Sequence, residues 1–79
     1  MAEVRYFAAA GEATGVTREQ VSAQTLGELI TEVIERHGPR LESVLGRCSL
    51  LVDGAYSSDP QTPLREDSTV DVLPPFAGG

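Results

Sequence analysis

Apolar and polar residues alternate at the start of the chain in the pattern of a strand with one buried face. Over residues 3–8 this alternation places Val4, Tyr6 and Ala8 on one side and Phe7 on the other. The sequence therefore predicts an opening strand whose first face packs on a core and whose second face carries Phe7.

Two later segments also indicate strands. Residues 69–73 alternate like the opening segment, whereas residues 48–52 are almost continuously apolar. The second run ends in Asp53-Gly54, a dipeptide that favours a tight hairpin turn, so a short return strand is expected to begin near Tyr56.

Between the opening strand and the middle of the chain the hydrophobic signal is weak. Residues 11–15 begin and end in glycine and are predicted to form a turn. Residues 17–23 are predicted to form a polar strand in which Val21 supplies the main apolar contact. Residues 41–45 suggest a short helical turn that closes over the core.

One longer segment has helical periodicity. Thr25 with Glu28 three residues later resembles a capping box, and Gly38 followed by Pro39 marks the end of the helix. The apolar positions between these signals recur at a spacing of three and four residues: Leu26, Leu29, Ile30, Val33 and Ile34.

The predicted order is strand, strand, helix, strand, short strand, strand. This order is typical of an α+β domain of the β-grasp, or ubiquitin-like, class, with a mixed sheet of four to five strands packed on one main helix. Residues 1–73 would form the domain, and residues 74–79 an extended tail, because Pro74 lacks an N–H and should end strand pairing.

Composition and chain length exclude several classes of function. The 79 residues carry 12 acidic and 6 basic side chains, a net charge of −6, which disfavours nucleic acid and anionic membranes as partners. A domain of this size has little room for a deep catalytic cleft. We therefore expect a cytoplasmic protein that delivers a group to a partner's active site, without a membrane span or a leader peptide.

The lone Cys48 and the lone His37 do not form a metal-ligand cluster, and no metal site is expected. Cys48 enters an apolar strand and is interpreted as a small core residue, with relay of a persulfide as the alternative. His37 falls in the last turn of the helix, where a cation or cap is favoured, and local spacing supplies no acidic partner for it.

The C-terminal Gly78-Gly79 is the strongest candidate for chemistry. A terminal carboxylate on glycine has no Cβ beside it and can enter a narrow channel. A frayed terminus is the alternative interpretation.

The whole chain resembles the ubiquitin-like sulfur carriers of the MoaD/ThiS type, and within them most closely the small subunit of molybdopterin synthase. The specific motif is the Pro-Pro-x-x-Gly-Gly ending. The weaker matches are residues 4–8, 52–54, 62–64 and 70–73.

The resemblance implies that an E1-like adenylating enzyme uses ATP to activate Gly79, and that a sulfur donor protein then converts it to a thiocarboxylate. No cofactor would be bound by the chain itself. The tail would enter the molybdopterin synthase large subunit, in a heterotetramer, and donate sulfur to a pterin precursor. Carriers for thiamine thiazole or cysteine synthesis, and a ubiquitin-like modifier without sulfur chemistry, remain alternatives.

Partner-binding residues are predicted from strand periodicity. Phe7, Leu51 and Leu73 should face away from the helix and line up across the open face of the sheet, because the final strand of a β-grasp sheet lies between the first and the third. The surface would extend through a further set of residues toward the partner: Tyr56, Pro74, Pro75, Phe76 and Ala77.

Overall fold

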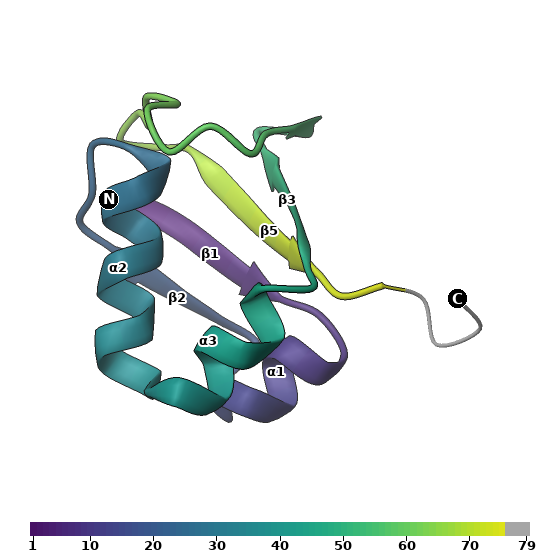
Figure 1. Cartoon of the computed structure of the whole chain (residues 1–79). Helices are drawn as coiled ribbons and strands as arrows, with labels where there is room; N and C mark the ends of the chain where they lie inside the picture. The colour runs from purple at the N-terminus through teal and green to yellow at the C-terminus, as the bar shows by residue number, and fades with distance from the viewer. Residues whose placement is uncertain (76–79) are drawn as a thin grey trace.

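The computed structural model describes residues 1–75. A five-stranded sheet packs against α2, and two shorter helices, α1 and α3, lie at one end of the sheet (Figure 1). The elements in chain order are β1 (Ala2–Tyr6), α1 (Ala9–Thr14), β2 (Arg18–Val21), α2 (Leu26–His37), α3 (Pro39–Leu45), β3 (Ser49–Val52), β4 (Ala55–Tyr56) and β5 (Thr69–Leu73).

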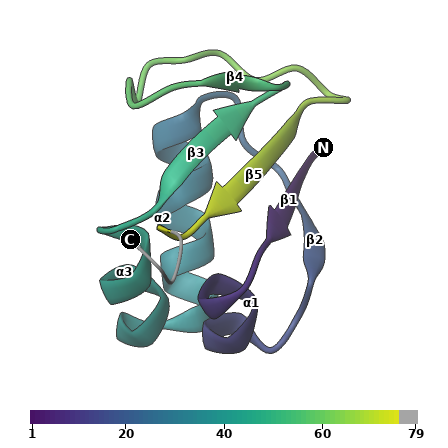
Figure 2. The same cartoon turned by 90° about the vertical axis from the view of Figure 1, so that its right-hand side faces the viewer.

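The strands are arranged in the order β2-β1-β5-β3-β4. The central pair, β1 and β5, is parallel, and the other pairs are antiparallel. Figure 2 looks onto the strands with α2 behind them, so within residues 1–75 the near face carries no helix. This mixed sheet with one main covering helix confirms the predicted β-grasp fold and the position of the last strand between the first and the third.

The core lies between the sheet and α2. Val4, Val70 and Val72 are fully buried on the sheet side, and Leu29 and Val33 are fully buried on the helix side. Burial alternates along β1 and β5 as the sequence pattern requires. The predicted inward faces of these two strands are therefore confirmed.

Side chains mark the start of α2, and backbone geometry marks its end. The Thr25 hydroxyl accepts a hydrogen bond from the Glu28 N–H at 3.2 Å, while the Glu28 carboxylate accepts one from the Gln24 N–H at 3.0 Å. Gly38 adopts φ 84° and donates its N–H to Ile34 at 2.7 Å, after which Pro39 begins α3. The predicted cap is confirmed, except that Glu28 binds Gln24 rather than Thr25.

The loop between β4 and β5 covers the first turn of α2. Leu26 donates its N–H to Thr62 and Gly27 donates to Pro60, each at 2.9 Å. A Cβ at Gly27 would lie 3.0 Å from the Pro60 Cβ, too close for an ordinary contact. Glycine at this position therefore lets the loop approach the helix and satisfy its first N–H groups.

The predicted turn at residues 11–15 is wrong, because the chain forms α1 over Ala9–Thr14. Only Ala10 of this helix is buried, so its apolar periodicity is too weak to recognise in the sequence. The predicted inward position of Ala8 is also wrong. β1 ends at Tyr6, and Ala8 is exposed in the turn that leads into α1.

Within the described residues, none of the helices combines the length and the apolar character needed to cross a bilayer.

Candidate functional site

The C-terminal segment leaves the sheet directly after β5. Pro74 and Pro75 lead the chain away from the sheet and from α2 (Figure 1). Four of the predicted site residues lie outside the described residues: Phe76, Ala77, Gly78 and Gly79. The structure therefore defines the root of the tail and the surfaces around it.

The open face of the sheet carries Leu51 and Leu73, but the register places them in different rows. Leu51 lies opposite Asp71 on one side and Tyr56 on the other, whereas Leu73 lies opposite Ser49. The expectation that Phe7, Leu51 and Leu73 line up in one row is therefore wrong. Strand alternation assigns a face to each residue, but only pairing assigns its row.

These residues still border one another on one surface. Leu51 and Leu73 are diagonal neighbours, and both are half-buried. Phe7 follows β1 and donates its N–H to Val72 at 3.2 Å, which places it beside the end of β5. Phe7 and Tyr56 are 41% and 76% exposed, so both aromatic side chains are accessible to a partner.

An ion pair lies in the same row of the sheet as Leu51 and Tyr56. Arg5 donates two hydrogen bonds to Asp71, from Nε at 2.6 Å and from Nη2 at 2.8 Å. The two residues are directly paired across β1 and β5 although 66 positions separate them. Sequence periodicity missed this pair, because it requires the parallel register of the two central strands.

A partly buried polar cluster connects the end of α2 to β1 and β2. The Glu19 carboxylate accepts hydrogen bonds from the Tyr6 hydroxyl at 2.6 Å and from Arg36 Nη1 at 3.0 Å, and it contacts His37 Nε2 at 2.6 Å. His37 thus has an acidic partner from a distant strand, which local spacing did not reveal.

The cluster perturbs the ionisation of two of its members. Burial, followed by the hydrogen bond to Glu19, raises the pKa of the Tyr6 hydroxyl, so this group stays a donor. Burial alone would raise the pKa of Glu19, but the hydrogen bonds from its three partners outweigh it and lower that pKa. The cluster therefore favours an ionised Glu19 and stabilises the fold.

Cys48 has the environment of a packed residue. Its side chain is half-buried, and its Sγ donates to the Val44 carbonyl at 3.2 Å. Burial raises the pKa of this thiol more than the nearby Arg47 lowers it, so the reactive thiolate is disfavoured. This geometry favours the structural interpretation of Cys48 over a persulfide relay.

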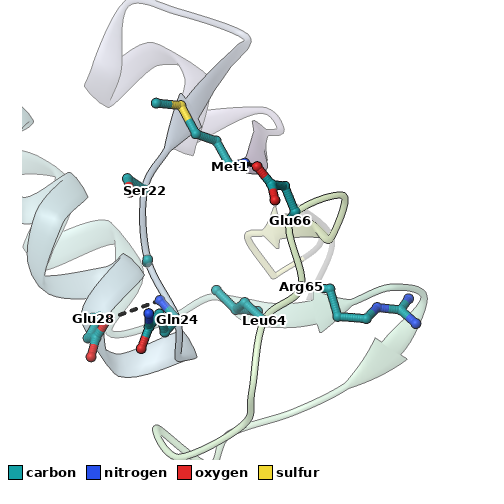
Figure 3. A pocket seen from close by; sticks show the side chains of 8 residues that line it. Met1, Ser22, Gln24, Glu28, Leu64, Arg65 and Glu66 are labelled. Carbon is teal, nitrogen blue, oxygen red and sulfur yellow. Dashed lines mark hydrogen bonds and ion pairs between the residues drawn. The ribbon is translucent and has the colours of Figure 1, made fainter.

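A broad polar pocket of about 670 Å³ lies near the N-terminus, at the end of the sheet opposite the tail (Figure 3). Two of its charged groups already have partners: Glu28 binds the Gln24 N–H at 3.0 Å, and the Met1 amino group lies 3.7 Å from Glu66. No group of three or more potential metal ligands occurs in residues 1–75. The pocket lining is Met1, Ser22, Ala23, Gln24, Glu28, Leu64, Arg65 and Glu66.

A second, mainly apolar groove of about 370 Å³ lies at the root of the tail. It is formed by the start of α1, the end of α3 and the two prolines after β5. Its lining residues are Ala8, Ala9, Val44, Arg47, Pro74 and Pro75.

Solved structures with the same fold include three informative relatives. The chain is 27% identical to a chain of the complex of subunits 1 and 2 of the molybdopterin-converting factor of Helicobacter pylori, covering 99% of this chain and 97% of that one with a TM-score of 0.72. SAMP1 of Haloferax volcanii is 21% identical, with coverages of 99% and 98% and a TM-score of 0.86. The BexX/CysO complex of Amycolatopsis orientalis contains a chain that is 19% identical, with full coverage of both chains and a TM-score of 0.81.

The two relatives below 25% identity support the fold alone. A search of curated proteins found no match. The model of the ThiS family matches residues 4–79, which includes every strand except the first two residues of β1 and extends through the terminal Gly78-Gly79. The expected resemblance is thereby confirmed, and the chain belongs to the ThiS family of ubiquitin-like sulfur carriers.

Proposed function

We propose that the chain carries sulfur as a thiocarboxylate on Gly79 and acts as the small subunit of a molybdopterin synthase. The observation that carries this proposal is the family match, which continues through the Gly-Gly ending at residues 78–79. The similarity to the Helicobacter pylori molybdopterin-converting factor, at 27% identity, favours this pathway.

The chemistry requires activation of the terminal carboxylate. An ionised α-carboxylate, with an ordinary pKa of about 3.3–3.7, resists nucleophiles because of its charge and lacks a good leaving group. An E1-like enzyme would transfer AMP from ATP to the Gly79 carboxylate and release pyrophosphate. Hydrosulfide supplied by a donor protein would then form the C–S bond as the C–O bond to AMP breaks, which releases AMP and leaves the thiocarboxylate.

The tail would deliver that sulfur to the large subunit. Six extended residues, 74–79, span at most about 20 Å, which is enough to enter a channel in a partner. Pro74 and Pro75 favour a polyproline-like segment and reduce the entropy lost when the tail is ordered. Transfer to a pterin precursor returns Gly79 to the carboxylate, so two carriers in succession would supply the two sulfurs of a dithiolene.

Intact mass spectrometry tests the sulfur chemistry. Protein isolated from its native host is expected to contain a fraction that is heavier by the difference between one sulfur and one oxygen atom, located on the peptide ending at Gly79. Finding only the carboxylate form together with adducts to other proteins would instead identify a protein modifier.

The pathway is tested by reconstitution. The thiocarboxylated chain is expected to form molybdopterin from the cyclic pterin precursor when mixed with the host's large subunit. The alternative is sulfur delivery in another pathway, because the fold that the chain shares with the CysO relative does not distinguish one pathway from another. Transfer to a thiazole or cysteine synthase, with no transfer to the large subunit, would establish that alternative.

The open face of the sheet is proposed to bind the large subunit. Truncating an apolar anchor at the centre of an interface commonly weakens the free energy of binding by about 2 kcal/mol or more. Phe7→Ala and Leu73→Ala are each expected to weaken binding at least about tenfold, or roughly 1.4 kcal/mol, in calorimetry with the purified large subunit.

Val16→Ala provides a matched control, because Val16 is 39% exposed but lies in the loop between α1 and β2. Affinity should be unchanged in this variant. Equal affinity of the wild type, Phe7→Ala and Leu73→Ala proteins would exclude the open face as the binding surface.

A further inference from the structure

The groove at the root of the tail brings together three separate parts of the chain. Ala8 and Ala9 come from the start of α1, Val44 from α3, and Pro74 and Pro75 follow β5. These side chains make the lining mainly apolar, and Val44 and Pro74 are only half-buried. The groove is therefore open to an apolar group from outside.

Arg47 adds a positive charge to the rim of this groove. Its side chain is exposed and, within residues 1–75, lies within 4.0 Å of no acidic group, whereas Arg5 and Arg36 form ion pairs with Asp71 and Glu19. An unpaired guanidinium beside apolar surface is suited to a carboxylate that a partner brings with it. In a chain of net charge −6, an unpaired arginine provides a local attraction for an anionic group.

The backbone of Ala8 is strained where it lines the groove. Its φ of 50° and ψ of −123° match the first central position of a type II′ turn, where glycine dominates. The Ala10 N–H donates to the Phe7 carbonyl at 3.0 Å and closes this turn. Strained backbone of this kind is concentrated at functional sites. Glycine would relieve the strain at position 8, but it would also remove the methyl group that lines the groove.

The groove also lies at the root of the segment that carries the proposed reactive terminus. Four residues, 76–79, separate Pro75 from the Gly79 carboxylate, and four extended residues span at most about 14 Å. The active site of a protein that accepts Gly79 therefore lies within about 14 Å of Pro75 at the edge of the groove.

We propose that this groove is a docking site for the adenylating enzyme that activates Gly79. An apolar side chain of that enzyme would occupy the groove, and a neighbouring carboxylate would pair with Arg47. This inference rests on the proposed function, because it requires that Gly79 be adenylated.

Charge reversal at Arg47 tests the proposal against a closely matched control. Arg47→Glu removes no ion pair within residues 1–75, and Arg40→Glu makes the same charge change at an exposed, equally unpaired arginine in α3 that does not line the groove. The probe is the host's E1-like adenylating enzyme with ATP, and the measured quantities are kcat and KM for the carrier in pyrophosphate release. Thermal melts check that each variant is folded.

Arg47→Glu is expected to raise KM for the carrier at least about tenfold with little change in kcat, while Arg40→Glu changes KM less than about twofold. Ala9→Trp, which fills the groove at an exposed position, should raise KM in the same way without a change of charge. These results together would support docking in the groove.

Each other outcome overturns the proposal in a recognisable way. Equal KM values for Arg47→Glu and Arg40→Glu would exclude Arg47 as a contact. Faster adenylation of Arg47→Glu would identify the chain's own tail as the occupant, and a dimer of the wild type that Arg47→Glu dissociates would identify a second copy. A wild-type chain that the enzyme does not adenylate would overturn the proposed function itself.

Discussion

Deleting Gly79, or adding one residue after it, is expected to abolish sulfur transfer and leave the stability of the domain unchanged. The proposed chemistry takes place on the terminal carboxylate, and an added residue moves that carboxylate by up to about 3.6 Å and places a side chain beside it. A misplacement of even 1 Å can cost about a hundredfold in rate, so the loss should be essentially complete. The measurement is molybdopterin formation by the reconstituted system, with thermal melts of each variant.

A variant with one residue added before Met1 is the control, because it changes the length of the chain without changing the tail. Its activity should equal that of the wild type. Full activity of the C-terminally extended variant, with intact mass showing that the extra residue is retained, would refute chemistry at the terminus.

Glu19→Ala is expected to destabilise the domain by about 2–4 kcal/mol, because it leaves the buried Tyr6 hydroxyl and the His37 ring without their acceptor. Tyr6 is only 4% exposed, so its hydroxyl would have little access to solvent as a replacement partner. For a domain of this size the melting temperature should fall by at least about 8 °C. Urea unfolding at pH 7 measures the free energy directly.

Glu32→Ala is the matched control, since Glu32 also accepts a 3.0 Å hydrogen bond from Arg36 but has a 42% exposed side chain, against 17% for Glu19. Removing the Glu32 carboxylate should lower the free energy of unfolding by less than about 1 kcal/mol. Equal effects of the two substitutions would contradict a stabilising role for the partly buried cluster around Glu19.

The same cluster predicts a pH dependence. The pKa of Glu19 is lowered below its ordinary value of 4.5, so folding favours the ionised carboxylate. The resulting stabilisation is fully present above pH 4.5 and is lost as the pH falls through the lower folded-state pKa. The difference in unfolding free energy between wild type and Glu19→Ala should therefore shrink as unfolding is measured at pH values below 4.5.

Several elements were predictable because their signals are local. Asp53 and Gly54 adopt φ values of 50° and 88°, as the hairpin signal indicated, and β5 has the predicted bounds, Thr69–Leu73. The α2 helix begins after Thr25 and ends before Gly38, where capping and glycine chemistry require it. In each case the neighbouring residues alone determine the backbone geometry.

The α1 helix was not predicted, because its local sequence signal is weak. Its six residues include Gly11 and bury only Ala10, so it has too little periodicity to resemble a helix. Packing supplies what its sequence lacks: the turn at Ala8 ends β1, and the short helix lies beside α3 at the end of the sheet (Figure 2). Tertiary contacts here outweigh weak local propensity.

The sequence by itself determined the strand faces, the capped helix, the β-grasp order and the Gly-Gly ending, because periodicity, turn chemistry and a terminal motif are properties of adjacent residues. Only the tertiary structure decided which distant residues meet. Strand register separated Leu51 from Leu73 and paired Arg5 with Asp71, and chain packing brought Glu19 to His37 and placed Arg47 beside the prolines at the root of the tail. These contacts depend on how the elements pack in three dimensions, and no spacing along the chain encodes that arrangement.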